Sequence, residues 1–493
     1  MVKPMQANGV LSNFLRCCVW LGFLVLIAAQ APTQEAAARN ERSTVTALFV
    51  SDIHFEPFRD PGKVAQLAAA PVGEWKSILA APDSSDRETR FAEIQKACHT
   101  RGEDTGFTLL QSSLQAIKAH AAGAKFVTVS GDLISHAFTC KFSAVFPQAA
   151  PGDYRAFVEK TIEFVVASLR ETLLRVPVYA ALGNNDSDCG DYQLDANSEF
   201  LAATGKVIAA DLPRPQKQRA EKDFAAGGYF SVSLPAPVSR TRLLVLDDLF
   251  MSRRYQNCSG KDDPAPADAQ ITWLEQQLSE ARRKHQKVWV IAHIPPGIDP
   301  YSTAAKGKSI CAGTAPVMFL SSEALPETMA KYGDVIRLAI FAHTHMDELR
   351  LFEPSKPDAN ERGVAVKMVP SISPVDGNNP SFTVAQIDPA SATLKDYRVF
   401  IASNQTGVDT VWSEEYDYAE AYHQADFSAA SVQRLIAEFD ADPDAKTSET
   451  QNFIHNYSPG ATLRVLQMFW PQYVCALKND EGSAFAKCAC GAK

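Results

Sequence analysis

The chain has 493 residues, of which 46% are hydrophobic and 21% are charged, and its formal net charge is −9. These values are ordinary for a globular protein, and the length allows one large domain together with a smaller one. An acidic surface argues against binding to a nucleic-acid duplex, because neutralising backbone phosphates requires a basic face.

The N-terminus has the features of an export signal. Lys3 and Arg16 precede an apolar run over residues 17–29, which is too short to span a bilayer comfortably. We therefore expect residues 1–30 to be a signal peptide and the protein to be secreted or periplasmic. An uncleaved membrane anchor is the alternative. Residues 31–43 are rich in Ala, Gln, Glu and Arg and are expected to form a linker.

Strands and helices are predicted to alternate along most of the chain. Five apolar, β-prone runs are expected to be buried strands: Val45–Val50, Phe126–Val129, Val178–Leu182, Val288–Ala292 and Val335–Ala342. Amphipathic helices are expected over Thr108–Ala122, Asp153–Leu174 and Asp268–His285, with Asp268 as the N-cap of the last. This order of elements predicts an α/β fold.

The remaining segments are less regular in sequence. The Pro-rich stretch Phe55–Thr105 is expected to be a long irregular loop, and Gly297–Ala315 a loop over the site. Further strands are expected over Thr241–Leu246 and, in a second sheet packed on the first, over Leu349–Phe352, Val364–Val369 and Phe382–Ile387. From about Thr410 the pattern becomes helical and aromatic.

Side chains that can bind metal ions follow the five predicted strands. They are Asp52, His54, Asp132, Asn184, His293, His343 and His345. Ligands collect in the loops at the carboxyl ends of such strands, so we expect these side chains to form one site. Carboxylate, amide and imidazole donors without a thiolate suit zinc first, with manganese or iron as alternatives.

In this order the motifs resemble the calcineurin-like metallophosphoesterase family, and within it the acid sphingomyelinase-like and endopolyphosphatase-like branch. The resemblance runs from about Val45 to the C-terminus and includes His293-Ile294-Pro295-Pro296-Gly297 and a tail with Met468-Phe469-Trp470 before Cys475. It implies a four-layer α/β/β/α sandwich over residues 44–402. A C-terminal helical, Cys-containing subdomain would follow over residues 403–493.

The resemblance also implies two divalent ions. Asp52, His54, Asp132 and His345 would hold one ion, and Asp132, Asn184, His293 and His343 would hold the other, so that Asp132 bridges the pair. Two ions held in this way lower the pKa of bound water, and metal-bound hydroxide then becomes the nucleophile near neutral pH.

One departure from the sphingomyelinase pattern concerns the leaving-group proton. Asn185 stands where that pattern has a histidine, and an amide cannot give a proton, although it could bind a phosphate oxygen. The branch also carries a histidine at the position of His136, four residues after Asp132, and we expect His136 to be the general acid. The alternatives are a surface His136 without a role, and Asp186 or Asp188 as weaker candidates.

Eight cysteines follow the predicted signal peptide, at positions 98, 140, 189, 258, 311, 475, 488 and 490. An even number in an exported chain favours disulfides, whereas free buried thiols would be expected if the chain is not exported. The resemblance implies one pair, Cys258–Cys311, which flanks the helix and strand that lead to His293.

The sequence therefore predicts an exported phosphoester hydrolase with two metal ions. A phosphodiesterase acting on a small-molecule or lipid substrate, which could lie at a membrane surface, is the first interpretation. Endopolyphosphatase and phosphomonoesterase activities are the catalytic alternatives. A metal-bound binding protein with weak catalysis, suggested by Asn185, is the non-enzymatic one.

Overall fold

The computed structural model describes residues 44–174, 176–238, 240–305, 310–353, 363–460 and 465–491. The expected signal peptide and linker lie outside these ranges. Within them, no helix is both long enough and apolar enough to cross a membrane.

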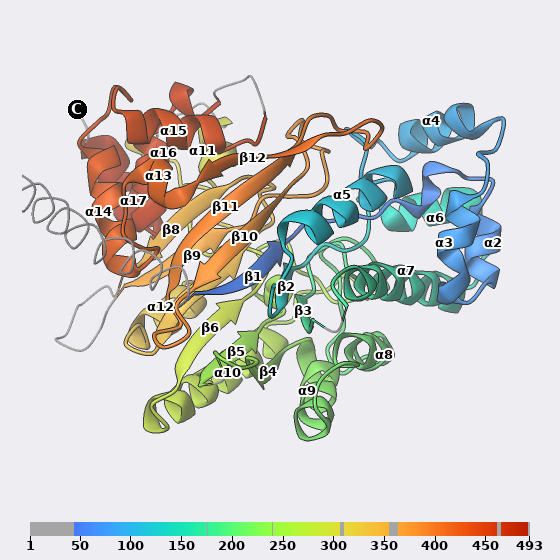
Figure 1. Ribbon diagram of the computed structural model, residues 1–493, viewed down its shortest axis with the longest axis horizontal. Helices are drawn as coiled ribbons and strands as arrows, with labels where there is room; N and C mark the ends of the chain where they lie inside the picture. Colours follow the sequence, from blue (N-terminus) through green and yellow to red (C-terminus); the bar gives the residue numbers. More distant parts are fainter. Residues whose placement is uncertain are drawn as a thin grey trace, which may run out of the picture. The chain divides into compact units, whose positions relative to one another are not determined.

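Two six-stranded sheets form the centre of the fold (Figure 1). The first has the order β12-β11-β10-β1-β2-β3, and the second has the order β4-β5-β6-β7-β9-β8. The strands of the first sheet are β1 Val45–Val50, β2 Val127–Ser130, β3 Val178–Ala181, β10 Ser381–Ile387, β11 Leu394–Ala402 and β12 Trp412–Asp417. Those of the second are β4 Phe230–Ser233, β5 Thr241–Val245, β6 Lys287–Ile291, β7 Ile336–Phe341, β8 Glu348–Phe352 and β9 Val364–Met368.

Parallel strands carry the predicted ligands in both sheets. In the first sheet β1 pairs in parallel with β2, and β2 with β3. In the second sheet β5, β6 and β7 are parallel neighbours. Nearly all residues of these strands are buried, as the apolar runs predicted.

The two sheets pack face to face through large aromatic side chains. Trp289 of β6 is fully buried, and its ring centroid lies 6.0 Å from that of Phe49 on β1 and 5.7 Å from that of Phe126. Helices cover the outer faces, which gives the expected α/β/β/α arrangement (Figure 1). The helices against the first sheet include α5 Phe107–His120, α7 Pro151–Thr172 and α8 Glu199–Ile208, and those against the second include α10 Ala265–Arg283 and α12 Ala324–Lys331.

The stretch between Phe55 and Thr105 is not the long irregular loop that the sequence predicted. It contains three short helices, α2 Val64–Ala69, α3 Val72–Ala80 and α4 Arg87–Ala97. Pro71 is the N-cap of α3, where a residue without a backbone N–H is tolerated, so this proline separates helices instead of preventing them. Trp75 anchors α3 against Phe157 and Phe164 of α7, with ring centroids 5.6 and 5.5 Å apart.

Other predicted boundaries also need correction. Helix α10 begins three residues before Asp268, which lies in its first turn; the N-cap is Pro264. Strand β10 belongs to the first sheet, not the second, because it pairs antiparallel with β1 from Val45↔Ile387 onward. The segment after Thr410 begins with strand β12 and becomes helical only afterwards.

The C-terminal part of the chain is helical and continues from the first sheet. Strand β12 extends that sheet beyond residue 402, and the proposed boundary at 402–403 stays a prediction. The helices that follow are α13 Tyr418–Tyr422, α14 Ala429–Asp440, α15 Ser448–Asn456, α16 Trp470–Lys478 and α17 Gly482–Gly491. Of these, α14 and α16 contact β8 of the second sheet. The remaining helices are α6 Phe138–Val145, α9 Arg214–Gly227 and α11 Pro300–Ala305.

The predicted Cys258–Cys311 pair is wrong. The disulfides are Cys98–Cys140, Cys189–Cys258, Cys311–Cys490 and Cys475–Cys488, with Cα–Cα distances of 5.4 to 5.8 Å. Cys258 pairs with Cys189 because a backbone bridge between Gln193 and Gln256 places the two loops side by side. Cys311 instead faces helix α17 at the C-terminus.

Candidate metal centre and active site

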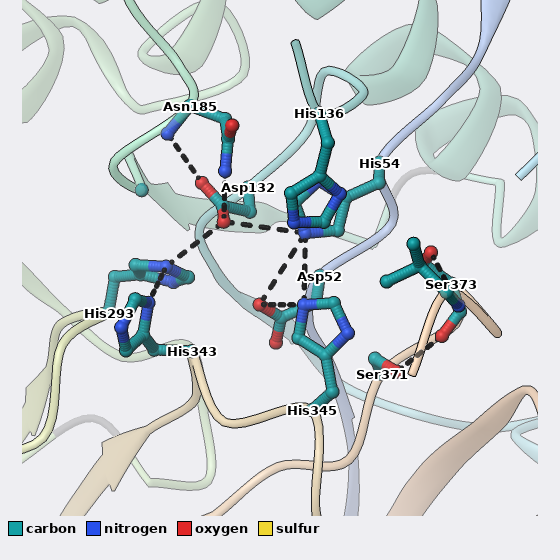
Figure 2. Close-up of polar contacts among 12 residues, drawn as sticks. Asp52, His54, Asp132, His136, Asn185, His293, His343, His345, Ser371 and Ser373 are labelled. Carbon is teal, nitrogen blue, oxygen red and sulfur yellow. Dashed lines mark hydrogen bonds and ion pairs between the residues drawn. The ribbon is translucent and has the colours of Figure 1, made fainter. Parts of the chain in front are cut away.

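The loops after five parallel strands bring the seven predicted ligands together, and Figure 2 labels all of them except Asn184. Asp52 and His54 follow β1, Asp132 follows β2, and Asn184 follows β3; from the second sheet, His293 follows β6, and His343 and His345 follow β7. The carboxyl ends of the ligand-bearing strands therefore meet at one place, as the sequence predicted, although the strands come from two sheets and the strands before His293 and His343 lie in the second.

The backbone of this site is held in an unusual conformation. Five of the seven residues have a positive φ, between 44° and 72°: Asp52, His54, Asp132, His343 and His345. Residues with a side chain rarely adopt this left-handed region, and such strain collects at functional sites. The turns after β1, β2 and β7 thus point side chains into the site that an extended strand would direct elsewhere.

Two glycines allow the strand-end loops to approach each other. A Cβ atom on Gly183 would lie 2.2 Å from Asp132 Oδ1 and 2.4 Å from the Asp132 backbone nitrogen. A Cβ atom on Gly131 would lie 2.8 Å from His293 Nδ1. Only glycine fits at these close approaches, so the Gly-Asp and Gly-Asn pairs of the motifs are a packing requirement of the site.

The first cluster contains Asp52, His54, Asp132 and His345. The Nε2 atoms of His54 and His345 are 3.2 Å apart, and His345 Nε2 lies 3.5 Å from Asp52 Oδ1. Asp132 Oδ2 lies 3.4 Å from His54 Nε2. Four donor atoms that could coordinate one cation therefore converge in a fully buried space.

The second cluster contains Asp132, Asn184, His293 and His343. His293 Nε2 lies 3.2 Å from Asp132 Oδ2, 3.1 Å from Asn184 Oδ1 and 3.2 Å from His343 Nδ1. The same carboxylate oxygen of Asp132 therefore faces both clusters (Figure 2).

Backbone carbonyls orient two of the histidines. His54 Nδ1 lies 3.0 Å from the carbonyl oxygen of Ile134, and His293 Nδ1 lies 2.7 Å from that of Ser130. A carbonyl oxygen only accepts, so Nδ1 carries the proton and donates, and the lone pair of Nε2 is directed into the site. This is how imidazole ligands are usually held in metal sites.

Burial governs the charge of the first cluster. It lowers the pKa of His54 to about 4 and that of His345 to about 3, so both imidazoles are neutral near pH 7. It also raises the pKa of Asp52 to about 7, and both oxygens of this buried carboxylate lack a hydrogen-bond partner among the described residues. A buried, unpartnered carboxylate beside neutral imidazoles fits a divalent cation, which would satisfy all of them.

In the second cluster, Asp132 and His293 form an ion pair. Burial opposes charge on both Asp132 and His293, but their mutual attraction outweighs it. The pKa of Asp132 is held well below its usual range, and that of His293 is raised to about 10. A metal ion would displace the His293 proton, as ligand binding requires a deprotonated imidazole.

His136, the predicted general acid, stacks on His54. The ring centroids are 3.9 Å apart at an interplanar angle of 20°. Asp104 holds His136 twice: it accepts from the backbone N–H at 2.9 Å and lies 3.0 Å from Nδ1. Burial disfavours the charged imidazole, but Asp104 more than compensates and raises the pKa of His136 to about 9.

Sequence reasoning missed Asp104. It lies in the stretch expected to be a loop, and its partners are distant in sequence. The carboxylate is buried beside Lys141, which pairs with Glu56, and it accepts a hydrogen bond from Ser373 Oγ at 2.9 Å. No local pattern marks such a residue.

Asn185 contacts a predicted ligand directly. Its backbone N–H and its side-chain Nδ2 each donate to the Asp132 carboxylate at 2.9 Å. Asp186 is buried and accepts from the backbone N–H groups of Leu133, Ile134 and Gly183, so it braces two loops. These bonds make Asp186 a structural residue in this site.

Asp248 is a second supporting residue to which the sequence analysis assigned no role. Its Oδ1 accepts from the backbone N–H groups of His293, at 3.2 Å, and Ile294, at 3.0 Å. Its signal was its position three residues after the end of strand β5, in Asp247-Asp248. An acidic residue near the end of a buried strand can therefore hold the backbone of a predicted ligand as well as be a ligand itself.

A cavity of about 620 Å³ opens beside His343 and Thr344. Its lining includes the aromatic residues Tyr301, Phe319 and Tyr457 and the charged residues Arg101, Asp299 and Asp376. Residues 299–302 come from the insertion that was expected to lie over the site. The cavity has the size and mixed lining of a small-molecule site.

Comparison with known proteins identifies the family. Residues 45–347 match the Calcineurin-like phosphoesterase family, and the chain belongs to it. It is therefore a metal-dependent phosphoric ester hydrolase.

The relatives lie in the branch that the motifs indicated. Acid sphingomyelinase-like phosphodiesterase 3b of Mus musculus is 25% identical over 470 residues, covering 90% of this chain and 89% of that protein. Cyclic GMP-AMP phosphodiesterase SMPDL3A of Mus musculus is 26% identical over 498 residues, covering 97% and 99%. Sphingomyelinase phosphodiesterase D of Dictyostelium discoideum is 30% identical over 247 residues, covering 49% and 51%.

Among solved structures, a dimetal phosphatase from Danio rerio aligns with 76% of this chain and 99% of its own, at 12% identity and a TM-score of 0.38.

Proposed function

We propose that this chain is an exported phosphodiesterase that uses two divalent ions to hydrolyse small-molecule or lipid phosphodiesters. The observation that carries the proposal is the position of Asp132 Oδ2, 3.4 Å from His54 Nε2 and 3.2 Å from His293 Nε2. A carboxylate shared by two imidazole clusters is what a bridged pair of ions requires.

Each ion would have its own set of ligands. Asp52, His54, Asp132 and His345 would hold one, and Asp132, Asn184, His293 and His343 the other. When bound, two such ions supply a strong nucleophile near neutral pH and offset the charge of the phosphoryl oxygens. Asn185 holds the Asp132 carboxylate in place through two hydrogen bonds, and this support does not need a titratable group.

The proton for the leaving oxygen comes from His136 in this proposal. Asp104 engages Nδ1, which leaves Nε2 as the nitrogen that can reach a substrate. The side chain is 37% exposed, so it borders solvent while resting on His54. An imidazole that is oriented by a buried carboxylate and reaches the substrate side is the arrangement that a general acid requires.

The relatives and the cavity favour a phosphodiester with a bulky organic group. The two relatives that match over nearly their full length are named as phosphodiesterases, and the name of one specifies cyclic GMP-AMP. Tyr301, Phe319 and Tyr457 offer aromatic surface beside His343 for a base, a headgroup or a lipid.

Export is supported by the cysteines. All eight cysteines after the expected signal peptide form disulfides, which persist in oxidising compartments. The alternative of free buried thiols does not fit these four pairs, and a secreted or periplasmic location agrees both with the disulfides and with the expected signal peptide.

Elemental analysis together with a substrate panel tests the function. We expect two divalent ions per chain and faster hydrolysis of bis(4-nitrophenyl) phosphate than of 4-nitrophenyl phosphate or polyphosphate. Asp132→Asn should lower metal occupancy and activity together, whereas Asp268→Asn, in the first turn of α10, should change neither. One ion or none in active protein would refute the bridged pair, and preference for the monoester or polyphosphate would refute the substrate class.

A further inference from the structure

The loop after β3 folds back onto the predicted ligand from which it starts. The backbone N–H of Tyr192 donates to the carbonyl oxygen of Asn184 at 3.0 Å. Tyr192 has a φ of 58°, in the left-handed region that bulky residues rarely adopt. The disulfide Cys189–Cys258 ties the same loop to the segment after β5. A strained tyrosine held at a ligand indicates a role beyond packing.

The residue before this tyrosine fixes the orientation of Asn184. Asn184 Nδ2 donates to Asp191 Oδ1 at 2.7 Å. A carboxylate only accepts hydrogen bonds, so the amide nitrogen must face Asp191. The amide oxygen then faces the second cluster, 3.1 Å from His293 Nε2. With Asp191 absent, the amide could turn its nitrogen toward the cation and lose the ligand.

Tyr192 performs the same task for His343. Its hydroxyl oxygen lies 3.2 Å from His343 Nε2, and the two rings meet edge to face. If Nε2–H donates to this hydroxyl, the lone pair of Nδ1 is directed into the second cluster, 3.2 Å from His293 Nε2.

Arg254 braces both residues from outside. Its guanidinium carbon lies 3.9 Å from the centre of the Tyr192 ring, and its Nη2 lies 3.4 Å from Asp191 Oδ2. Its side chain is 66% exposed, so it lies on the solvent side of the loop. Cation–π and ionic contacts from one side chain therefore hold two neighbouring residues.

We propose that Asp191 and Tyr192, braced by Arg254, are positioning residues that aim the ligands Asn184 and His343 at the second metal ion. The inference rests on the proposed binuclear site. His54 and His293 are oriented by backbone carbonyls, which no side-chain change removes. The affinity of the second ion can thus be altered by changing residues that do not bind it, while the first ion is retained.

Zinc titration of the metal-free full chain, in competition with a chromophoric chelator, tests the inference. Tyr192→Phe and Asp191→Ala should each weaken one of the two zinc-binding steps by about 10- to 100-fold, the usual effect of removing a partner of a metal ligand. The other step should stay unchanged. Arg254→Ala, at an exposed position, should weaken the same step by a smaller factor.

Matched controls come from the same loops. Tyr255→Phe removes a hydroxyl that donates to the Leu194 carbonyl at 3.0 Å, and Asp195→Ala removes an acceptor of the Cys258 backbone N–H. Neither touches a predicted ligand, and both should bind two ions like the unaltered chain.

The outcomes separate the two proposals. If the unaltered chain binds two ions and the Tyr192 and Asp191 variants behave like the controls, or lose both steps equally, the positioning role is wrong and the binuclear site stands. If the unaltered chain binds fewer than two ions, both proposals fall. Should Tyr192→Phe not fold, an unchanged titration of Arg254→Ala and Asp191→Ala overturns the inference.

Discussion

Several residues of the site adopt a strained backbone conformation that lets their side chains meet at one place. Left-handed backbone at a residue with a side chain costs on the order of 1–3 kcal/mol, and five of the seven predicted ligands adopt it. Packing of the strands next to these turns must offset this energetic cost, because the turns themselves cannot. Burial of Val50, Val129 and Phe341 directly before three of these turns shows where the support lies.

At the residue scale, the sequence identified the metal ligands better than it identified the residues that hold and orient the site. Asp52 and His345 were recognisable because donor chemistry directly follows an apolar run. Asp104, Asp191 and Tyr192 were not, because each acts on a residue whose position in space depends on the whole fold. A single sequence contains no sign that Tyr192 meets His343, 151 positions later.

Replacement of His136 tests the proton donor. His136→Ala should reduce hydrolysis of diesters with poor leaving groups by about 10²–10⁴-fold, the usual contribution of general acid catalysis. It should reduce hydrolysis of nitrophenyl diesters far less, because nitrophenolate leaves with little need for a proton. Steady-state rates on the two substrate types measure the difference.

The control for that experiment is His423→Ala, since His423 is 71% exposed and lies on α13's C-cap. It should leave both rates unchanged. An equal loss on both substrates after His136→Ala would move the proton-donating role to another group.

At the scale of secondary-structure elements, the local sequence pattern predicted which helices and strands form but not which strands pair with each other. The periodicity of α5 and α7 and the apolar runs of β1 and β6 predicted these elements to within a few residues. Strand β10 was assigned to the wrong sheet because pairing with β1 joins residues more than 300 positions apart. Alternation along a strand defines its buried face and leaves its neighbour undetermined.

Strand β12 carries a carboxylate that should make stability depend on pH. Glu415 Oε1 accepts from the Gly460 backbone N–H at 3.1 Å, while its other oxygen is buried without a partner among the described residues. Burial raises the pKa of Glu415 to about 8 from an unfolded value of 4.5. Between these values the folded chain keeps a proton that the unfolded chain has released.

The free energy of unfolding should therefore fall as pH rises from about 4.5 to 8, by at most about 1.4 kcal/mol per pH unit from this group. Glu415→Gln keeps an acceptor for Gly460 and removes the titration. The variant should be more stable than the unaltered chain at pH 8, and the difference should shrink toward pH 5. Urea unfolding across this range measures it.

Glu414→Gln is the matched control, because Glu414 lies on the same strand and is 40% exposed. The free energy of unfolding of this variant should change with pH in the same way as that of the unaltered chain. If that of Glu415→Gln also changes in this way, the Glu415 carboxylate is not protonated in the folded chain, and the expectation is wrong.

For the whole molecule, the C-terminal helices reach the metal-binding loops through side chains. Tyr473 of α16 donates to Glu348 Oε2 at 2.6 Å, and Thr344, between His343 and His345, donates to Glu348 Oε1 at 2.6 Å. The tail predicted from its cysteines and aromatic residues is thus connected to the site by two hydrogen bonds. The sequence indicated the tail but not this connection, which spans 125 positions.

The disulfide Cys311–Cys490 should contribute strongly to the stability of this arrangement. Its two cysteines are 179 positions apart, and on the loop-entropy model such a closure stabilises the fold by up to about 5 kcal/mol. Cys475–Cys488 closes only 13 positions and should contribute about 3 kcal/mol on the same model. Replacing both members of a pair by Ser avoids a free thiol that could exchange.

Denaturant unfolding should therefore show a larger loss of free energy for Cys311→Ser with Cys490→Ser than for Cys475→Ser with Cys488→Ser. Non-reducing peptide mapping of the unaltered chain gives the direct check, because Cys311 should be recovered joined to the C-terminal peptide. Recovery of Cys311 joined to Cys258 would restore the pairing expected from the family resemblance. It would also detach α17 from the insertion beside the cavity, since no other disulfide in the described residues connects them.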